Sequence, residues 1–228
     1  MNDSQWIKET DDLITNPTPR IPICLCLDTS GSMSGSPINT LNQAILEFYR
    51  DIDSDHQTAA SCEIAVVKFD TTAELIEDFS LVAVKETQPL TASGTTNMQE
   101  GVQLALDILK QRKNDYKRNG VDYYQPWLII MSDGQPNDAA SLHALQNEIK
   151  DLESAKRLMV LPVGVGNAAD LNILADFSNK RPGAFPLKGL KFKEFFNFIS
   201  QSMESISRSR PDEKVQLPIE LIKEWSDL

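Results

Sequence analysis

Hydroxyl and carboxylate side chains gather in three short segments of the sequence. The segments are Asp28-Thr29-Ser30-Gly31-Ser32-Met33, Gly94-Thr95-Thr96-Asn97-Met98 and Ser132-Asp133-Gly134. They offer two carboxylates and three hydroxyls: Asp28, Asp133, Ser30, Ser32 and one threonine of the pair Thr95 and Thr96. A set of oxygen ligands without His or Cys suits a hard divalent cation, Mg²⁺ or Mn²⁺, and does not suit zinc or copper.

The charge balance of this ligand set indicates what the ion would do. Hydroxyls are neutral ligands, and Mg²⁺ gives up its waters reluctantly, so the aspartates can hold those waters instead of the ion itself. An ion that few protein carboxylates neutralise stays electron-poor and favours an incoming carboxylate from another molecule. We therefore expect the metal to hold an Asp or Glu side chain of a protein partner.

Short apolar runs alternate with segments of helical periodicity, which is typical of βα units on a mostly parallel sheet. The sequence predicts strands over 21–28, 62–70, 73–79, 127–131, 158–165 and 184–187. It predicts helices that start at Pro37 and Asn97 and helices over 141–155, 170–178 and 191–207. In a doubly wound sheet with strand order 3-2-1-4-5-6, a crevice opens beyond the carboxyl ends of strands 1 and 4, where Asp28 and Asp133 lie.

Composition restricts the partners and the compartment. The 228 residues are 41% hydrophobic and 24% charged, which is enough for one main globular domain. Asp and Glu number 33 against 22 Lys and Arg, and a net charge of −11 disfavours nucleic acid and anionic membranes as partners. We expect a cytoplasmic protein, because the first residues lack a signal-peptide pattern, and we expect Cys24, Cys26 and Cys62 to be buried thiols.

The segment Asp28-Thr29-Ser30-Gly31-Ser32 resembles the DxSxS motif of von Willebrand factor A (VWA) domains. That family's metal-ion-dependent adhesion site adds a Thr from a later loop and an Asp from a strand end. The resemblance implies a doubly wound α/β fold whose mostly parallel central sheet has one short antiparallel edge strand and helices on both faces. It also implies that Ser30, Ser32 and Thr96 bind the metal directly, and that Asp28 and Asp133 bind it directly or through water.

Thr96 is chosen over Thr95 because VWA loops often have the pattern Gly-Gly-Thr, but the alignment leaves this assignment open by one residue. The strings DTSGSMSGSPI, SDGQPND and VGVG are similar to TerY-like VWA proteins of bacterial tellurium-resistance and stress loci. The resemblance covers about Pro19 to Ser209. It divides the chain into an N-terminal tail (1–18), a VWA domain (19–209) and a C-terminal linker with a short amphipathic tail (210–228).

One enzyme class stays open as an alternative. Asp28-Thr29-Ser30-Gly31 after a strand also resembles the phosphorylatable Asp loop of haloacid-dehalogenase-like phosphohydrolases, which require Mg²⁺. Ser30 stands where many of these phosphatases have an acid/base Asp, and the later motif Asp133-Gly134-Gln135-Pro136-Asn137-Asp138 has one residue too many. The sequence therefore favours a metal-dependent interaction module without enzymatic activity. It does not name the partner, the stress or the oligomeric state.

Overall fold

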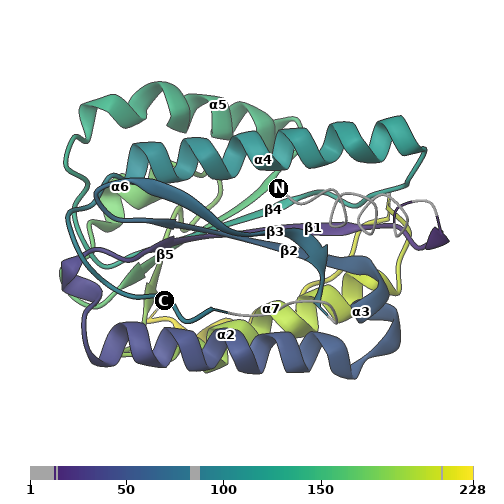
Figure 1. Ribbon diagram of the computed structural model, residues 1–228, viewed down its shortest axis with the longest axis horizontal. Coiled ribbons are helices and arrows are strands. Elements are labelled where there is room, and N and C mark those ends of the chain that lie inside the picture. The colour runs from purple at the N-terminus through teal and green to yellow at the C-terminus, as the bar shows by residue number, and fades with distance from the viewer. Residues whose placement is uncertain (1–12, 14, 83–87, 212, 228) are drawn as a thin grey trace.

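The computed structural model describes Leu13 and residues 15–82, 88–211 and 213–227. Within these residues, six strands form one sheet in the order β3-β2-β1-β4-β5-β6 (Figure 1). The strands are β1 (Ile21–Asp28), β2 (Cys62–Phe69), β3 (Ala73–Leu81), β4 (Trp127–Ser132), β5 (Met159–Val165) and β6 (Phe185–Leu187). Every neighbouring pair is parallel except β2 with β3. The predicted strand order and the antiparallel edge are confirmed, but the edge strand has nine residues and continues past the predicted end at Phe79.

Two layers of helices cover the sheet, and β1 supplies a core to each of them. Successive side chains of a strand point to opposite faces. Accordingly, Ile21, Ile23, Leu25 and Leu27 belong to one buried cluster, and Cys24 and Cys26 belong to the other. This double burial explains why β1 is almost entirely apolar.

Helices α2 (Ser36–Ser54), α3 (His56–Ser61) and α7 (Phe192–Ser207) lie on one face of the sheet. Helices α4 (Met98–Asn119), α5 (His143–Ser154) and α6 (Leu171–Ala175) lie on the other face (Figure 1). The short α8 (Ile222–Trp225) follows α7 near the C-terminus. The sequence did not predict α3. Its six residues carry too little periodicity to stand out.

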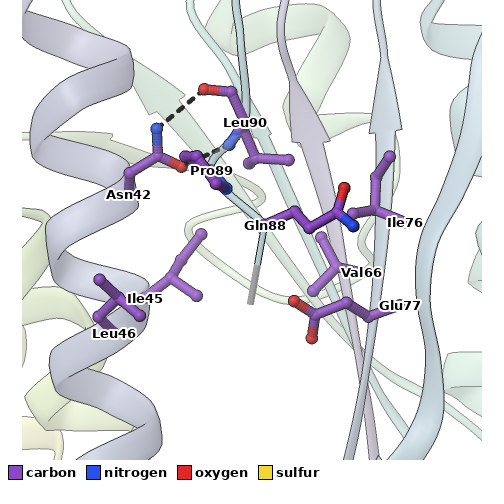
Figure 2. A pocket seen from close by; sticks show the side chains of 9 residues that line it. All are labelled: Asn42, Ile45, Leu46, Val66, Ile76, Glu77, Gln88, Pro89 and Leu90. Atoms are coloured by element: carbon purple, nitrogen blue, oxygen red, sulfur yellow. Dashed lines mark hydrogen bonds between the residues drawn. The ribbon is translucent and has the colours of Figure 1, made fainter. Parts of the chain in front are cut away.

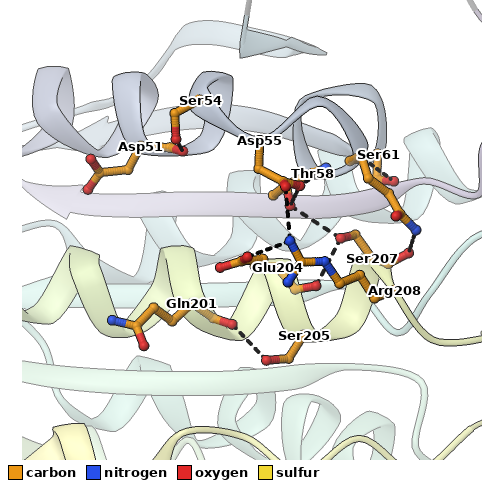
Figure 3. Close-up of polar contacts among 11 residues, drawn as sticks. Asp51, Ser54, Asp55, Thr58, Ser61, Gln201, Glu204, Ser205, Ser207 and Arg208 are labelled. Atoms are coloured by element: carbon orange, nitrogen blue, oxygen red, sulfur yellow. Dashed lines mark hydrogen bonds and ion pairs between the residues drawn. The ribbon is translucent and has the colours of Figure 1, made fainter.

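A cluster of polar contacts joins the start of α3 to the end of α7 (Figure 3). Asp55 caps α3, since its Oδ1 accepts from the Thr58 N–H at 2.9 Å and from the Thr58 hydroxyl at 2.7 Å. The Asp55 Oδ2 lies 3.0 Å from Nη2 of Arg208, which also pairs with Glu204 at 2.6 Å. Gln57 donates to the Ser207 carbonyl at 2.5 Å. These contacts attach the C-terminal turn of α7 to the domain.

The described part of the C-terminal segment packs against the domain through Trp225, which is fully buried. Its ring lies 5.0 to 5.7 Å from the rings of Phe185, Phe195 and Phe198. The Trp225 carbonyl accepts from the Lys188 N–H at 2.8 Å. At the other end of the chain Leu13 is buried, while Trp6, Ile7 and Ile14 lie outside the described residues.

A buried charged cluster lies where β1 and β2 begin. Glu63 is fully buried, and its carboxylate accepts from Arg20 Nε at 3.1 Å, from Arg112 Nε at 2.7 Å and from the Tyr116 hydroxyl. Two guanidinium groups and a phenol thus satisfy one buried carboxylate, as a buried charge requires. This cluster fixes the end of the sheet opposite to Asp28.

Two sequence expectations concern burial and hydropathy. Cys24, Cys26 and Cys62 are buried free thiols, as predicted, and burial raises the pKa of each. In the described ranges, every helix is too short or too polar to cross a bilayer.

Candidate metal centre

The site begins where two neighbouring parallel strands end. Asp28 is the last residue of β1, and Asp133 directly follows β4, which pairs with β1. The Asp28 Oδ2 accepts from the Ser132 hydroxyl at 2.5 Å, and its Oδ1 accepts from the Ser30 N–H at 2.8 Å. Both carboxylates therefore lie at the same edge of the sheet.

The two serines connect these carboxylates, Ser30 through its backbone N–H to Asp28 and Ser32 through its hydroxyl to Asp133. Ser30 and Ser32 flank Gly31 at the start of a 3₁₀ turn over Gly31–Met33. Their hydroxyl oxygens are 3.0 Å apart, and the Ser32 hydroxyl donates to Asp133 Oδ1 at 2.7 Å. Ser30 is buried, whereas Ser32 is exposed, so the row of oxygens opens toward solvent.

Backbone hydrogen bonds bring the threonine segment to the same place. The Ser93 N–H donates to the Thr29 carbonyl at 2.8 Å, and the Gly31 N–H donates to the Gly94 carbonyl at 3.1 Å. Gly94 has a φ of 73° and lies so close to Thr71 that a β-carbon would clash with its side chain. Only glycine meets both conditions without strain.

The geometry distinguishes Thr96 from Thr95. Thr96 is buried, and its hydroxyl lies 3.5 Å from the point that a β-carbon of Gly134 would occupy. The Ser32 hydroxyl lies 3.9 Å from the same point, so Gly134 leaves space between the two oxygens. Thr95 is exposed, and its hydroxyl accepts from Nδ2 of Asn137 at 3.1 Å. The structure therefore brings Asp28, Ser30, Ser32, Thr96 and Asp133 together, with Thr96 as the inward threonine.

Two asparagines hold the threonine segment in position. The Thr96 N–H donates to Asn137 Oδ1 at 3.2 Å, and the Asn137 N–H donates to the Thr96 carbonyl at 3.0 Å. Upstream, Asn42 of α2 bonds both backbone groups of Leu90, at 2.9 and 2.8 Å (Figure 2). Asn42 and Leu90 also border a hollow of about 200 Å³ between α2 and β3. Figure 2 shows the side chains that line it.

Asp70, which directly follows β2, contacts both the threonine segment and the Asp28–Ser32 segment. Its carbonyl accepts from the Asn97 N–H at 2.7 Å, and its Oδ2 lies 3.4 Å from the Thr29 hydroxyl. Sequence reasoning did not assign a role to Asn42, Asp70 or Asn137. Asp70 could have been found, because it follows the strand that neighbours β1 at the same sheet edge. Asn42 carries no such signal, since its partner is a backbone 48 residues away.

The electrostatics of the site favour a cation. Burial raises the pKa of Asp28 above its usual range, the charge of Asp133 adds to this effect, and hydrogen bonds from Ser132 and Ser30 oppose it. Burial also raises the pKa of Asp133, against the hydrogen bond from Ser32. Neither carboxylate has a basic partner within 4.0 Å among the described residues. A bound divalent cation would offset both the burial and the mutual repulsion.

The donor set fits a hard divalent ion. It holds three hydroxyl oxygens and two carboxylates, and the described residues include no group of three His, Cys, Asp or Glu that could form a different metal site. Ser30, Ser32 and Thr96 would hold the ion, with Asp28 and Asp133 orienting the hydroxyls or its waters.

The von Willebrand factor type A domain family matches residues 23–209, which is most of the chain. This chain belongs to that family. The VWA domain is 24% identical over 172 residues to protein sll0103 of Synechocystis sp., which covers 72% of this chain and 37% of that protein. The chain therefore spans little more than a third of this relative's length.

Solved structures share the VWA fold. The vWF domain of the type V pili tip protein Mfa5 from Porphyromonas gingivalis aligns with a TM-score of 0.63 at 13% identity, covering 86% of this chain and 99% of that chain. Proximal thread matrix protein 1 from the mussel byssus aligns with a TM-score of 0.57 at 16% identity, covering 81% and 48%. In the structure of the mussel protein, zinc occupies the metal-ion-dependent adhesion site (MIDAS) motif, so the metal site of that protein accepts zinc.

Proposed function

We propose that this VWA domain binds Mg²⁺ or Mn²⁺ at the candidate metal centre and uses the ion to hold an acidic side chain of a protein partner. The observation that carries the proposal is the hydrogen-bonded chain from Asp28 through Ser30 and Ser32 to Asp133. Thr96 faces this row across Gly134. The proposed ligand set is Asp28, Ser30, Ser32, Thr96 and Asp133.

The chemistry of the ligands supports an acidic partner. Three of the five proposed ligands are neutral hydroxyls, so the ion keeps much of its positive charge and its affinity for an external carboxylate. Ca²⁺ prefers six to eight oxygens at longer distances and would be served less well by this small set. The net charge of −11 repels an acidic partner at long range, so the metal must supply the local attraction.

The setting of the protein is a further part of the proposal. The strings DTSGSMSGSPI, SDGQPND and VGVG support a TerY-like VWA protein in a cytoplasmic bacterial stress response of the tellurium-resistance type. We assign the metal-binding domain to residues 19–209, an N-terminal tail to 1–18, and a linker with a short amphipathic tail to 210–228. The domain acts as an interaction module and not as an enzyme.

Partner capture with and without chelator tests this function. The full chain should retain its partner from the native extract in Mg²⁺ or Mn²⁺, bind it less well in Ca²⁺, and lose it in chelator. The Ser30→Ala and Thr96→Ala variants should reproduce the chelator effect, while the Thr95→Ala variant should still bind. Equal capture in Mg²⁺ and in chelator would refute the metal-bridged mechanism.

The phosphohydrolase alternative makes an opposite prediction for Asp28. As a nucleophile, Asp28 would have to attack phosphorus with a carboxylate oxygen, yet both of its oxygens accept hydrogen bonds from Ser30 and Ser132. We expect no release of phosphate from an aryl phosphate in Mg²⁺. Release that is lost in the Asp28→Asn variant would favour the enzyme over the interaction module.

A further inference from the structure

A basic groove lies between α4 and α5, far from the metal centre. It has a volume of about 360 Å³, and its lining includes Lys110, Lys113 and Lys117 of α4 and Arg157 of the loop before β5. Glu148 of α5 is the one acidic residue in the lining. The helix α4 begins beside Thr96, and at 1.5 Å per residue Lys117 lies about 30 Å along it from the metal centre.

The cations of this groove are only partly neutralised. Lys110 pairs with Glu148 at 2.7 Å and with Asp107 at 3.6 Å. Lys117 and Arg157 form no ion pair with the residues that the structure describes. A chain with a net charge of −11 nevertheless brings these positive groups together around one hollow.

Lys113 lines the groove together with these two cations and is half-buried. Its ammonium group donates to the Arg157 carbonyl at 3.2 Å. Burial lowers the pKa of Lys113, and the charges of Arg157 and Lys117 lower it further. An anion in the groove would relieve this repulsion.

The floor of the groove is apolar. It consists of Leu106, Leu109, Pro126, Leu152 and Leu158. A ligand that places hydrocarbon on the floor and negative charge at the rim would match this lining. This match favours an amphipathic anion over a small inorganic one.

The spacing of the donors favours carboxylates along a peptide over a single phosphate group. Lys110, Lys113 and Lys117 extend over about 10 Å of helix, with side-chain amines as donors. The groove lies near the C-terminal ends of α4 and α5, where the free backbone groups are carbonyls, so only the side-chain cations can hold an anion there. Compact phosphates are usually held by backbone N–H groups at helix N-termini, which this groove does not offer.

We propose that this groove binds an acidic segment of a partner protein, with an apolar side chain on the leucine floor and carboxylates at Lys113, Lys117 and Arg157. The contact does not use the metal. It gives the domain a second binding surface, at the opposite end of α4 from the metal centre.

Peptide selection on the full chain in chelator tests the proposal. A random peptide display library is selected on the immobilised wild-type protein, and the affinity of the enriched peptides is measured by fluorescence anisotropy. We expect the enriched peptides to combine Asp or Glu with Leu or another apolar residue. The Arg157→Glu and Lys117→Glu variants should each weaken binding about tenfold or more, and binding should weaken as salt rises.

Arg50→Glu is the matched control. Arg50 is exposed on α2 at the other face of the sheet, and its substitution changes the net charge by the same amount as Arg157→Glu. It should leave the affinity within about twofold of the wild type. Equal loss in Arg157→Glu and Arg50→Glu, or no enrichment of acidic peptides, would overturn the proposal. Two other results would also overturn the proposal, because they would assign another occupant to the groove. One is binding of tripolyphosphate in place of peptides, and the other is self-association that Arg157→Glu abolishes. Because chelator is present throughout, failure here leaves the metal-bridged function untouched.

Discussion

Thr96 and Asn137 are joined by a reciprocal pair of hydrogen bonds, one through the Asn137 side chain at 3.2 Å and one between the two backbones at 3.0 Å. This pair connects the loop after β4 to the segment before α4. The pair therefore holds the segment with Thr96, the proposed threonine ligand, next to the loop with Asp133, the proposed aspartate ligand. In the proposed function Asn137 is a positioning residue, because it would act on the metal only through Thr96.

The Asn137→Ala variant should bind Mn²⁺ about ten- to a hundredfold more weakly than the wild type, since groups that orient metal ligands contribute by that amount. Folding should be nearly unchanged, because Asn137 is exposed. Calorimetric titration with Mn²⁺ measures the affinity. Asn119→Ala, at the far end of α4, is the control and should bind as the wild type does. Equal affinity in both variants would show that the pair does not position Thr96.

The Asp133→Asn variant should lose the thermal stabilisation that Mg²⁺ or Mn²⁺ gives to the wild type. In chelator it should be as stable as the wild type or more stable, because burial and the neighbouring Asp28 make the ionised carboxylate unfavourable. Thermal melts of the wild type and of Asp133→Asn, each with metal and with chelator, measure these differences. The control Asp138→Asn changes an exposed acid of the same loop and should keep the metal response. A variant that melts far below the wild type in chelator would make Asp133 a structural residue.

More of the fold could be predicted from the sequence than of the hydrogen bonds that hold the candidate site together. The apolar run of β1 and the position of Asp28 at its end are local patterns. The alternation of strands and helices predicted a doubly wound sheet, and the structure has the strand order expected of that fold. The bonds from Asn42 to Leu90 and from Asn137 to Thr96 join residues 48 and 41 positions apart. Periodicity carries no information about such pairs.

The Glu63→Gln variant should lose about 3 kcal/mol or more of its free energy of unfolding, because it leaves the guanidinium groups of Arg20 and Arg112 without their buried counter-charge. Urea titration at neutral pH measures this loss. Glu74→Gln is the matched control, since Glu74 is exposed and pairs with Lys68 at the surface. That variant should lose less than about 1 kcal/mol. Similar losses in the two variants would contradict the importance of the buried cluster.

Asp55 should give the protein a pH-dependent stability through its cap of α3 (Figure 3). The hydrogen bonds from Thr58 lower the pKa of Asp55 in the folded state, and Arg208 adds to the effect. A lowered pKa means that the contribution is complete above the unfolded value of about 3.9 and is lost as the pH falls through the folded value. Asp55→Asn keeps a capping oxygen but removes the charge. The wild type should therefore be more stable than Asp55→Asn at pH ~6, and the difference should shrink at pH ~3. A difference that stays constant over this range would contradict the role of the charge.

The proposed function requires that Asp28, Ser30, Ser32, Thr96 and Asp133 hold one divalent ion. A crystal of the full chain grown in Mn²⁺, with diffraction recorded for anomalous scattering, tests it most directly. We predict an anomalous peak within coordination distance of the hydroxyl oxygens of Ser30, Ser32 and Thr96, with Asp28 and Asp133 bound directly or through water. No peak at this position, or a peak coordinated by Thr95 or by other residues, would contradict the account.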